Sequence, residues 1–552
     1  MKKIILDIET DDIDASVLHL AVCKEIGTEQ HHIFGGPNGY DLSRLPKYLL
    51  GADKIIMHNG TSFDLPIVNR LLHTNIPYCK VVDTLILSYL FNPIIDDGHS
   101  LDAWGQRLGL HKLTKENFSF LEYSEEMEKY CKRDVDVTEK LYGYLKENSS
   151  VFSKKSVELE HKIRRIIDVQ QSTGFYLNEY RSRLLLSELN DESGIIENEL
   201  VKVFEPTIKE LKTKTKVIPF NPNSRQQIAD RLVKRGWEPT SFTEKTGQPI
   251  VNETTLAQCD IPEAKKLLRY MMLRKRTAQI KSWVDLINPD TQRVHGYVRT
   301  LGAVTGRMTH NNPNMAQVPS VYSPYGKECR ECWTVEDTDK HILVGADASS
   351  LELRCLAHYI QDPAYTKEIV EGDIHTANQK MAGLRTRDQA KTFIYAFLYG
   401  AGAAKIGSVV GGSPAQGQIL IQRFLERLPR LAAWRERVTE EAEKDSVVTG
   451  LDGRTLRVRS GHAAVNTLLQ GAGAIICKEW LVHIMDAVVS KGIEAKPVAN
   501  VHDEVQFEVS RTDAKIFMDI TKEAMVKAEQ SLKVKCPLDS EAKEGKTWAE
   551  TH

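Results

Sequence analysis

The chain has 552 residues, of which 41% are hydrophobic, and a formal net charge of −2. That length exceeds what one hydrophobic core serves, so we expect about three to five domains or subdomains. No apolar run reaches the roughly 18 residues of a membrane span, and the first strand-like run soon turns acidic, which argues against a signal peptide. We therefore expect a soluble, cytoplasmic protein without a membrane partner.

The cysteines and the net charge indicate the cell compartment and the kinds of partner to expect. Nine cysteines are scattered without framework spacing, which is typical of reduced thiols in a cell interior. Cys329 and Cys332 form one close pair, but no second pair would complete a tetrahedral zinc site. A net charge near zero does not by itself indicate a nucleic-acid partner. DNA binding would require basic residues to gather on one surface, and local basic runs occur at 209–216 and 269–281.

The opening sequence KKIILDIET predicts a strand that carries two carboxylates. Asp7 and Glu9 are two residues apart, so both side chains leave the same face of the strand. Adjacent carboxylates repel one another unless a cation lies between them. Taken alone, the pair is more simply explained as an acidic strand end at the protein surface.

Two further acidic motifs follow in residues 1–150. IIMHNGTSFDLPIV predicts a strand, a turn at Asn59, and then Asp64 at the start of a helix. In the helical stretch EMEKYCKRDVDVTEKLY, Tyr130 and Asp134 are four residues apart and share one face. The patterns Asp-x-Glu, Asn-x-x-x-Phe-Asp and Tyr-x-x-x-Asp, in this order, resemble exonuclease motifs I, II and III of the DEDD proofreading nucleases.

This resemblance implies an RNase H-like domain with 3′-to-5′ exonuclease activity. Four carboxylates would hold two divalent cations about 3.5 to 4 Å apart, one of which generates a hydroxide while the other stabilises the leaving oxygen. Oxygen ligands favour Mg²⁺, and Mn²⁺ can substitute for it. The four are Asp7, Glu9, Asp64 and Asp134.

Other residues near these motifs receive different roles. By the resemblance, Tyr130 orients the attacking water, and Asn59 and Phe63 hold the terminal nucleotide. Two nearby acids are left out of the site. We expect Asp83 to cap a helix or act as a structural acid, and Asp136, on the same helix as Asp134, to be solvated or to lie behind the metal ligands.

Residues 151–295 carry no catalytic motif. Apolar residues recur at helical spacing in VELEHKIRRIIDVQQ and between Tyr180 and Val203, which predicts long helices. Such stripes are core positions unless another observation shows otherwise.

Two predicted strands far apart in the chain each end in an aspartate. In HILVGADASSLELRCLAH, the apolar residues 342–344 form a strand that delivers Asp347 to its end, before a helical pattern begins. A helix N-cap is the ordinary explanation for such an aspartate. In VANVHDEVQFEV, a strand leads to His502, Asp503 and Glu504 and then resumes. Two strands that each present an Asp can build a two-metal site.

Between these strands, TRDQAKTFIYAFLYG predicts a helix with one polar and aromatic stripe. Arg387, Lys391, Tyr395 and Tyr399 recur every four residues and so share a face. A solvent-facing amphipathic helix is the alternative. Three apolar residues point the other way, into a core: Phe393, Ile394 and Phe397.

DASSLELR, TRDQAKTFIYAFLYG and VHDE resemble motifs A, B and C of the family A DNA polymerases, the group of bacterial DNA polymerase I and of podovirus-type phage replicative enzymes. The three motifs occur in the family's order. The resemblance implies an α/β multidomain protein in which the RNase H-like exonuclease domain precedes a right-hand polymerase with an antiparallel palm sheet. The expected division is 1–150 for the exonuclease domain, 151–295 for the thumb, 296–365 for the first part of the palm, 366–449 for the fingers and 450–552 for the second part of the palm.

The implied activity is DNA-dependent DNA synthesis in replication, a nucleotidyl transfer that needs alignment and charge neutralisation. Asp347 and Asp503 would hold two Mg²⁺ ions. Arg387 and Lys391 would place positive charge against the triphosphate, with Lys391 as proton donor to the pyrophosphate. His375, in GDIHTANQ, would be a further phosphate ligand.

Tyr395 and Tyr399 would offer rings to the incoming and templating bases. By the same resemblance Glu352, held by the Tyr395 hydroxyl, would fill the space that a ribose 2′-OH needs. Relatives with Tyr at the position of Tyr395 accept dideoxynucleotides, and we expect the same here.

DNA contacts are also implied. Arg307, in TGRMTHNNPNMAQVP, and Gln470, in NTLLQGAGA, would reach minor-groove acceptors that all correct base pairs share. His502 would contact the primer strand, and Glu504 would support the metal site at longer range. The final KTWAETH segment resembles the family's terminal Trp…His segment near the palm, with a frayed terminus as the alternative.

We expect primer-template DNA and dNTPs as partners, a monomeric chain, and location in the host cytoplasm if a phage encodes it. A replisome helicase/primase or a single-strand binding protein is a further expected partner. Only about 46 residues separate Gly174 from Asn221, which leaves no room for the thumb insertion that recruits thioredoxin in some phage relatives, so we expect no thioredoxin. The separate 5′-nuclease domain of the bacterial enzyme is also not expected. Two other function classes stay open: a nuclease whose polymerase half only binds DNA, and a DNA-binding replisome scaffold.

Overall fold

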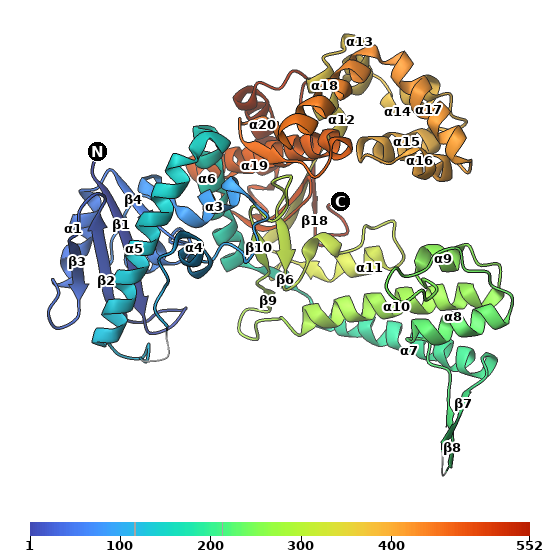
Figure 1. Cartoon of the computed structure of the whole chain (residues 1–552), viewed down its shortest axis with the longest axis horizontal. Helices are drawn as coiled ribbons and strands as arrows, with labels where there is room; N and C mark the ends of the chain where they lie inside the picture. Colours follow the sequence, from blue (N-terminus) through green and yellow to red (C-terminus); the bar gives the residue numbers. More distant parts are fainter. Residues whose placement is uncertain (115–117, 212–213) are drawn as a thin grey trace. The chain divides into compact units, whose positions relative to one another are not determined.

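The computed structural model describes residues 1–114, 118–211 and 214–552 (Figure 1). Its contacts divide the chain into two compact units. The first comprises residues 1–173, 298–310 and 344–543, and the second comprises residues 174–297, 311–343 and 544–552. Among the helices of the described residues, none is both long enough and apolar enough to cross a bilayer.

The first unit begins with a five-stranded mixed sheet in the order β3-β2-β1-β4-β5. β1 pairs antiparallel with β2 and parallel with β4, while β5 extends the parallel part and β3 the antiparallel part. The strands are β1 (Lys3–Thr10), β2 (Leu18–Glu25), β3 (His31–Gly35), β4 (Lys54–Met57) and β5 (Val81–Asp83).

Alternation along β1 assigns its residues to two cores. Ile4, Leu6 and Ile8 pack into a cluster with residues of α1 (Leu45–Leu50) and α2 (Asp64–Leu71). Ile5 packs on the other face against Met127, Cys131 and Val135 of α5 (Glu125–Glu147). Because side chains alternate along a strand, Asp7 and Glu9 lie on the α5 face. This part of the chain also contains α3 (Thr84–Phe91), α4 (Leu101–Leu108) and α6 (Lys154–Thr173).

A second sheet of the first unit has the order β16-β17-β13-β18, and β16 and β17 form an antiparallel hairpin. The long helices α19 and α20 pack together beside it: Trp480 of α19 donates its Nε1–H to the Thr521 carbonyl at 2.8 Å, and Phe507 of β17 meets Phe517 of α20 at 4.8 Å. The elements are β13 (His341–Ala348), β16 (Ala495–Val501), β17 (Glu504–Ser510), β18 (Ser540–Gly545), α12 (Leu351–Ile360), α19 (Gly461–Lys491) and α20 (Ala514–Leu532).

Six helices fill the chain between α12 and the β14–β15 hairpin (Figure 1). Thr386 caps the first turn of α15, and a capping box at Ser413 followed by Pro414 starts α17. The ring of Phe424 on α17 packs against Phe393 and Phe397 of α15, with centroids 5.3 and 5.5 Å away. The elements are α13 (Pro363–Val370), α14 (Ile374–Ala382), α15 (Arg387–Leu398), α16 (Ala403–Val409), α17 (Pro414–Arg427), α18 (Pro429–Asp445), β14 (Val447–Thr449) and β15 (Thr455–Arg457).

Residues 151–295 are mostly helical, as the sequence predicted, and all of them except 151–173 belong to the second unit. Its long helices α7 and α10 pack together, and a small sheet has the order β12-β6-β9. Trp548 is fully buried and packs on Phe175 with centroids 5.9 Å apart, so the terminal segment is packed and not frayed. The elements are β6 (Phe175–Leu177), α7 (Glu179–Val203), β7 (Thr207–Leu211), β8 (Lys214–Ile218), α8 (Arg225–Lys234), α9 (Glu253–Ala257), α10 (Pro262–Val284), β9 (Arg293–Val294), α11 (Gly326–Glu331) and β12 (Trp333–Thr334).

Near residue 300, two short strands pair with each other: β10 (Tyr297–Arg299) and β11 (Thr309–Asn311). Between them runs the loop that contains Arg307. Gly302 and Ala303 donate their backbone N–H groups to the Arg307 carbonyl, at 3.1 and 3.2 Å, and this closes the loop on itself.

Candidate active sites

β1 and α5 bring together the acidic residues of the first sheet. One ligand atom from each of Asp7, Glu9 and Cys131 lies within 4.8 Å of the other two. The Cys131 Sγ donates to Asp7 Oδ2 at 3.2 Å. Asp7 and Glu9 therefore share one face, as the two-residue spacing predicted, and that face is the one α5 covers.

Asp64 joins this cluster from the first position of α2, where its side chain is buried. Burial raises the pKa of the Asp64 carboxyl well above its usual range, and the nearby charges of Asp7 and Asp83 raise it further. Several carboxylates packed this closely carry an electrostatic cost that bound cations would remove. The donor set consists of carboxylate oxygens with one thiol, and oxygen ligands fit Mg²⁺ or Mn²⁺.

Asp134 and Tyr130 lie four residues apart on α5, and both are buried. The Nζ of Lys112 is 2.5 Å from Asp134 Oδ2 and 4.8 Å from the centre of the Tyr130 ring. Burial, together with the Asp134 charge, raises the pKa of Tyr130 to about 12, so its hydroxyl keeps its proton at neutral pH.

The loop before α2 is anchored by Asp83. Its carboxylate accepts the backbone N–H groups of Asn59 and Thr61, at 2.9 and 3.0 Å, and also caps α3 through Leu85. This confirms the interpretation of Asp83 as a structural cap. Asn59 itself has a left-handed backbone, with φ of 63°.

Two further residues of this region have defined surroundings. Phe63 is half-buried and packs on the core beneath the sheet. Asp136 pairs with Lys24 at 2.8 Å and with His31 at 2.9 Å. Lys24 lies on β2 and His31 on β3, so the partners of Asp136 are outside the Asp7–Glu9 cluster.

The second acidic site forms where β13 meets the β16–β17 turn. The backbone N–H of Ala348 donates to the carbonyl of Asp503 at 3.0 Å, so the residue directly before Ala348, Asp347, lies on the strand next to the turn that carries Asp503, although 156 positions separate the two aspartates. Burial raises the pKa of Asp503 to about 6, and the Glu352 charge adds to the shift. The N-cap position of α12 is Ser350, so the alternative of Asp347 as the cap of this helix is wrong.

Glu352 lies in the first turn of α12 and has two partners from elsewhere. Tyr399 donates its hydroxyl to Glu352 Oε1 at 3.0 Å, and Arg307 Nη2 lies 3.6 Å from the same oxygen. The sequence interpretation gave this hydrogen bond to Tyr395 and is wrong. The two rings are stacked along α15 with centroids 6.5 Å apart, but the tyrosine at the C-terminal end of the helix is the one that meets α12.

The stripe predicted on α15 does form. Arg387 makes a two-point ion pair with Asp373, with Nε to Oδ2 at 2.8 Å and Nη2 to Oδ1 at 3.2 Å. His375 lies 6.1 Å from Tyr395 between ring centroids. Burial lowers the pKa of His375, and the positive charges of Arg387 and Lys391 lower it further. Arg387 and Lys391 therefore place positive charge on the face of α15 that also carries Tyr395. Burial raises the pKa of Tyr395 to about 12, and the charges of Glu352, Asp503 and Asp347 add to the shift.

The Arg307 loop lies against α19 next to Gln470. A Cβ built at Gly471 would lie 3.4 Å from the Thr305 carbonyl oxygen, an ordinary contact distance, and 2.4 Å from Leu456 Cδ1 of β15, so a larger residue at 471 would displace the Leu456 side chain. Gln470 donates to Asn466 at 2.8 Å. Near the acidic turn, His502 has a φ of 57° and Glu504 is buried, with Gln506 donating to its Oε1 at 2.6 Å.

A family model described as DNA polymerase family A matches residues 191–550. The chain belongs to DNA polymerase family A. The DNA-directed DNA polymerase of Enterobacteria phage T3 is 32% identical over 706 residues, and that of Escherichia phage T7 is 32% identical over 705. Both alignments cover 100% of this chain and 100% of the relative.

A solved structure shows the same fold. It is the POL domain of Pol1 from M. smegmatis in complex with DNA primer-template and dNTP, with 19% sequence identity and a TM-score of 0.81. The likeness covers 99% of this chain and 95% of that one. It confirms the predicted fold class, an α/β multidomain protein of the family A type, with which an RNase H-like sheet and right-hand subdomains are consistent.

Two residues of this family A chain escaped sequence reasoning. Lys112 lies in an irregular segment between α4 and α5, where no periodicity connects it with Asp134. Asp373 has a recognisable signal as the cap of α14, but nothing in the sequence indicates that its carboxylate also meets Arg387.

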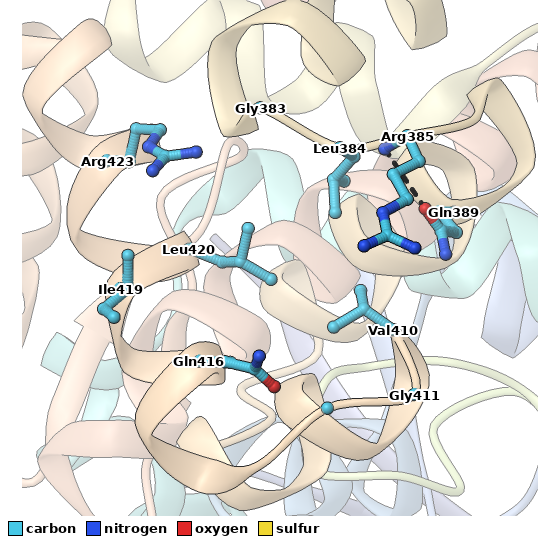
Figure 2. Close-up of a pocket in the computed structure, with 11 residues that line it drawn as sticks. Gly383, Leu384, Arg385, Gln389, Val410, Gly411, Gln416, Ile419, Leu420 and Arg423 are labelled. Carbon is cyan, nitrogen blue, oxygen red and sulfur yellow. Dashed lines mark hydrogen bonds between the residues drawn. The ribbon is translucent and has the colours of Figure 1, made fainter.

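A separate cavity of about 300 Å³ lies among the helices of residues 383–423 (Figure 2). Arg385 and Arg423 stand on opposite sides of it, with Leu420 between them (Figure 2). α15 contributes Gln389 to the lining but none of the four residues of the polar stripe. The cavity is therefore distinct from the cluster around Asp347 and Asp503.

Proposed function

We propose that this chain is a DNA-dependent DNA polymerase that extends a primer 3′ end with dNTPs during replication and removes wrong nucleotides by a 3′-to-5′ exonuclease. The observation that carries the proposal is the backbone hydrogen bond from Ala348 to Asp503. It joins two acidic strand ends beside a helix lined with positive charge and aromatic rings.

In the polymerase site, Asp347 and Asp503 are the residues that would hold divalent cations. Bound there, Mg²⁺ or Mn²⁺ would lower the pKa of the primer 3′-hydroxyl and neutralise the triphosphate. Arg387 and Lys391 add positive charge where the leaving pyrophosphate develops negative charge, and His375 is a further phosphate ligand there. Lys391 is the proposed proton donor to that group.

Base and sugar selection fall to α15 and α12. Tyr395 and Tyr399 present rings to the incoming and templating bases. Glu352 occupies the space that a ribose 2′-OH would need, and the Tyr399 hydroxyl holds it there. Arg307 and Gln470 contact the minor groove near the primer terminus, and His502 contacts the primer strand.

In the nuclease site, Asp7, Glu9, Asp64 and Asp134 would hold the cations that activate water and stabilise the leaving oxygen. Tyr130, which keeps its hydroxyl proton, orients the attacking water. Asn59 and Phe63 hold the terminal nucleotide. The partners on this proposal are primer-template DNA and dNTPs, and the chain acts as a monomer.

The test is primer extension with Mg²⁺ and dNTPs, run beside digestion of single-stranded DNA. Asp347→Ala should abolish extension and leave digestion intact, while Asp7→Ala should do the reverse. Extension that survives Asp347→Ala would overturn the polymerase assignment. A wild-type protein that only digests DNA would instead be a nuclease with a DNA-binding half, and one that does neither would be a scaffold.

A further inference from the structure

Lys112 is a positive charge inside the acidic cluster of the nuclease site. Its side chain is 17% exposed, and that of its partner Asp134 is 5% exposed. Nζ lies 2.5 Å from Asp134 Oδ2, which is a short, charge-assisted contact. The same ammonium lies over the ring of Tyr130, 4.8 Å from its centre. One lysine thus contacts two residues of the proposed site.

This pairing has a physical reason. A buried carboxylate without a partner is strongly unfavourable, and Asp134 lies on a 23-residue helix that fixes its backbone. The helix fixes the point from which the Asp134 side chain starts, so a cationic partner has to approach it from another segment. Lys112 can place its ammonium group beside Asp134, because it extends a flexible four-carbon side chain from an irregular segment.

The same contact has a cost for metal binding. Carboxylate oxygens bind Mg²⁺ at about 2.0 to 2.1 Å, so a cation bound to the Asp134 carboxylate would lie close to the ammonium that contacts its Oδ2. An ammonium and a divalent cation on one carboxylate repel each other. Metal binding at Asp134 therefore has to displace Lys112 or weaken its contact.

We propose that Lys112 is a positioning residue of the nuclease site, which holds Asp134 and Tyr130 in place and competes with a divalent cation for the Asp134 carboxylate. The inference rests on the proposed exonuclease function. The competition at Asp134 would set the concentration of divalent cation that the nuclease needs before it can cleave DNA. Proofreading strength would then depend on metal concentration through this lysine.

The experiment measures Mn²⁺ binding by electron paramagnetic resonance in an Asp347→Ala background, which disables the proposed polymerase metal site. We expect Lys112→Met to tighten Mn²⁺ binding by about tenfold, the lower end of the effect of groups next to metal ligands. Lys112→Arg, which keeps the charge, should bind as the parent does. Lys129→Met is the matched control, because Lys129 is an exposed lysine of α5 that pairs with Glu126 at 4.0 Å.

Digestion of single-stranded DNA across a Mg²⁺ titration completes the test. Lys112→Met should reach half-maximal rate at a lower Mg²⁺ concentration than the parent. Unchanged or weaker Mn²⁺ binding in Lys112→Met would overturn the inference even if the parent digests DNA normally. A parent protein that neither digests DNA nor loses Mn²⁺ binding on Asp7→Ala would refute the exonuclease proposal itself, which separates the two failures.

Discussion

Tyr399 donates its phenolic O–H to the Glu352 carboxylate, with Oη and Oε1 3.0 Å apart. Burial, with the Glu352 charge beside it, raises the pKa of Tyr399 to about 12, so the hydroxyl remains a donor at neutral pH. The bond links the end of α15 to the first turn of α12. A movement of α15 that breaks this bond would release the side chain that is proposed to exclude a ribose 2′-OH.

The first prediction concerns sugar selection. We expect Tyr399→Phe to raise ribonucleotide incorporation by about tenfold, because a hydrogen bond to a charged group contributes ~1.5 to 3 kcal/mol. The measurement is kcat/KM for UTP against dTTP in single-nucleotide extension. Glu352→Ala should have the larger effect, since it removes the obstructing side chain. A greater change for Tyr395→Phe than for Tyr399→Phe would return this role to Tyr395.

The second prediction concerns the Arg387–Asp373 ion pair. The triphosphate must draw Arg387 away from Asp373, and exposed ion pairs of this kind are weak because water and salt screen them. We therefore expect Asp373→Asn to lower KM for dNTPs by up to about fivefold with little change in kcat. Asparagine still caps α14, so the variant tests the charge alone.

Steady-state incorporation of one nucleotide at varied dNTP concentration gives both constants. Arg387→Ala should raise KM for dNTPs, so the two variants are expected to change KM in opposite directions in the same assay. If Asp373→Asn also raised KM, Asp373 would be orienting Arg387 toward the nucleotide and not competing with it.

Local sequence patterns predicted the parts of the sites that depend on one element at a time. The two-residue spacing of Asp7 and Glu9 placed both on one face of β1, and the four-residue spacing from Arg387 placed the stripe on one face of α15. The position of the first turn of α12 relative to α15 decides which tyrosine of that stripe contacts Glu352. The spacing along α15 is identical for Tyr395 and Tyr399, so it could not distinguish them.

The same reasoning explains why Lys112 was missed. Its contact with Asp134 joins an irregular segment to a helix, and neither has a period that includes the other. Asp347 and Asp503 were found despite a longer separation, because each ends an apolar strand and each matches a family motif. Tertiary contacts without such a signature have to be read from coordinates.

The third prediction is a pH dependence of stability that arises from His99. Trp104 donates to Ser88 Oγ at 2.7 Å, and Ser88 Oγ in turn shares a hydrogen bond of 2.7 Å with His99 Nδ1. Burial lowers the pKa of His99 to about 4. The pKa of the His99 imidazole is near 6.5 in the unfolded chain and about 4 in the folded protein. Between about pH 6.5 and pH 4, the imidazole is therefore protonated in the unfolded chain and neutral in the folded protein. Stability therefore falls as pH drops through this window.

From pH 7.5 to pH 5.0 this one histidine should cost about 2 kcal/mol of unfolding free energy. Urea unfolding followed by circular dichroism at both pH values measures the loss. His99→Gln should show a loss smaller by about that amount, whereas the same change at the exposed His73 should not alter the pH dependence. Equal pH dependence in all three proteins would contradict the assignment.

The fourth prediction concerns a buried charge cluster that connects α6 to α19 and the β14–β15 hairpin. Glu160 accepts from Arg454 at 2.6 Å and from Lys478 at 2.7 Å, and all three side chains are at most 3% exposed. Arg454 also pairs with Asp452, and Lys478 donates to the Thr300 carbonyl at 2.8 Å. The cluster thus anchors the start of the segment that leads to the Arg307 loop.

Glu160→Gln should destabilise the protein by about 3 to 5 kcal/mol, because it leaves two buried cations facing a neutral amide. Glu158→Gln is the matched control on the same helix. Glu158 pairs with Lys154 at 3.6 Å in an exposed setting, so its loss should cost less than about 1 kcal/mol. Urea unfolding of the two variants beside the parent gives the comparison. Equal stabilities for the two variants would mean that Asp452 alone compensates Arg454, and that the Glu160 carboxylate does not hold α6 to the hairpin.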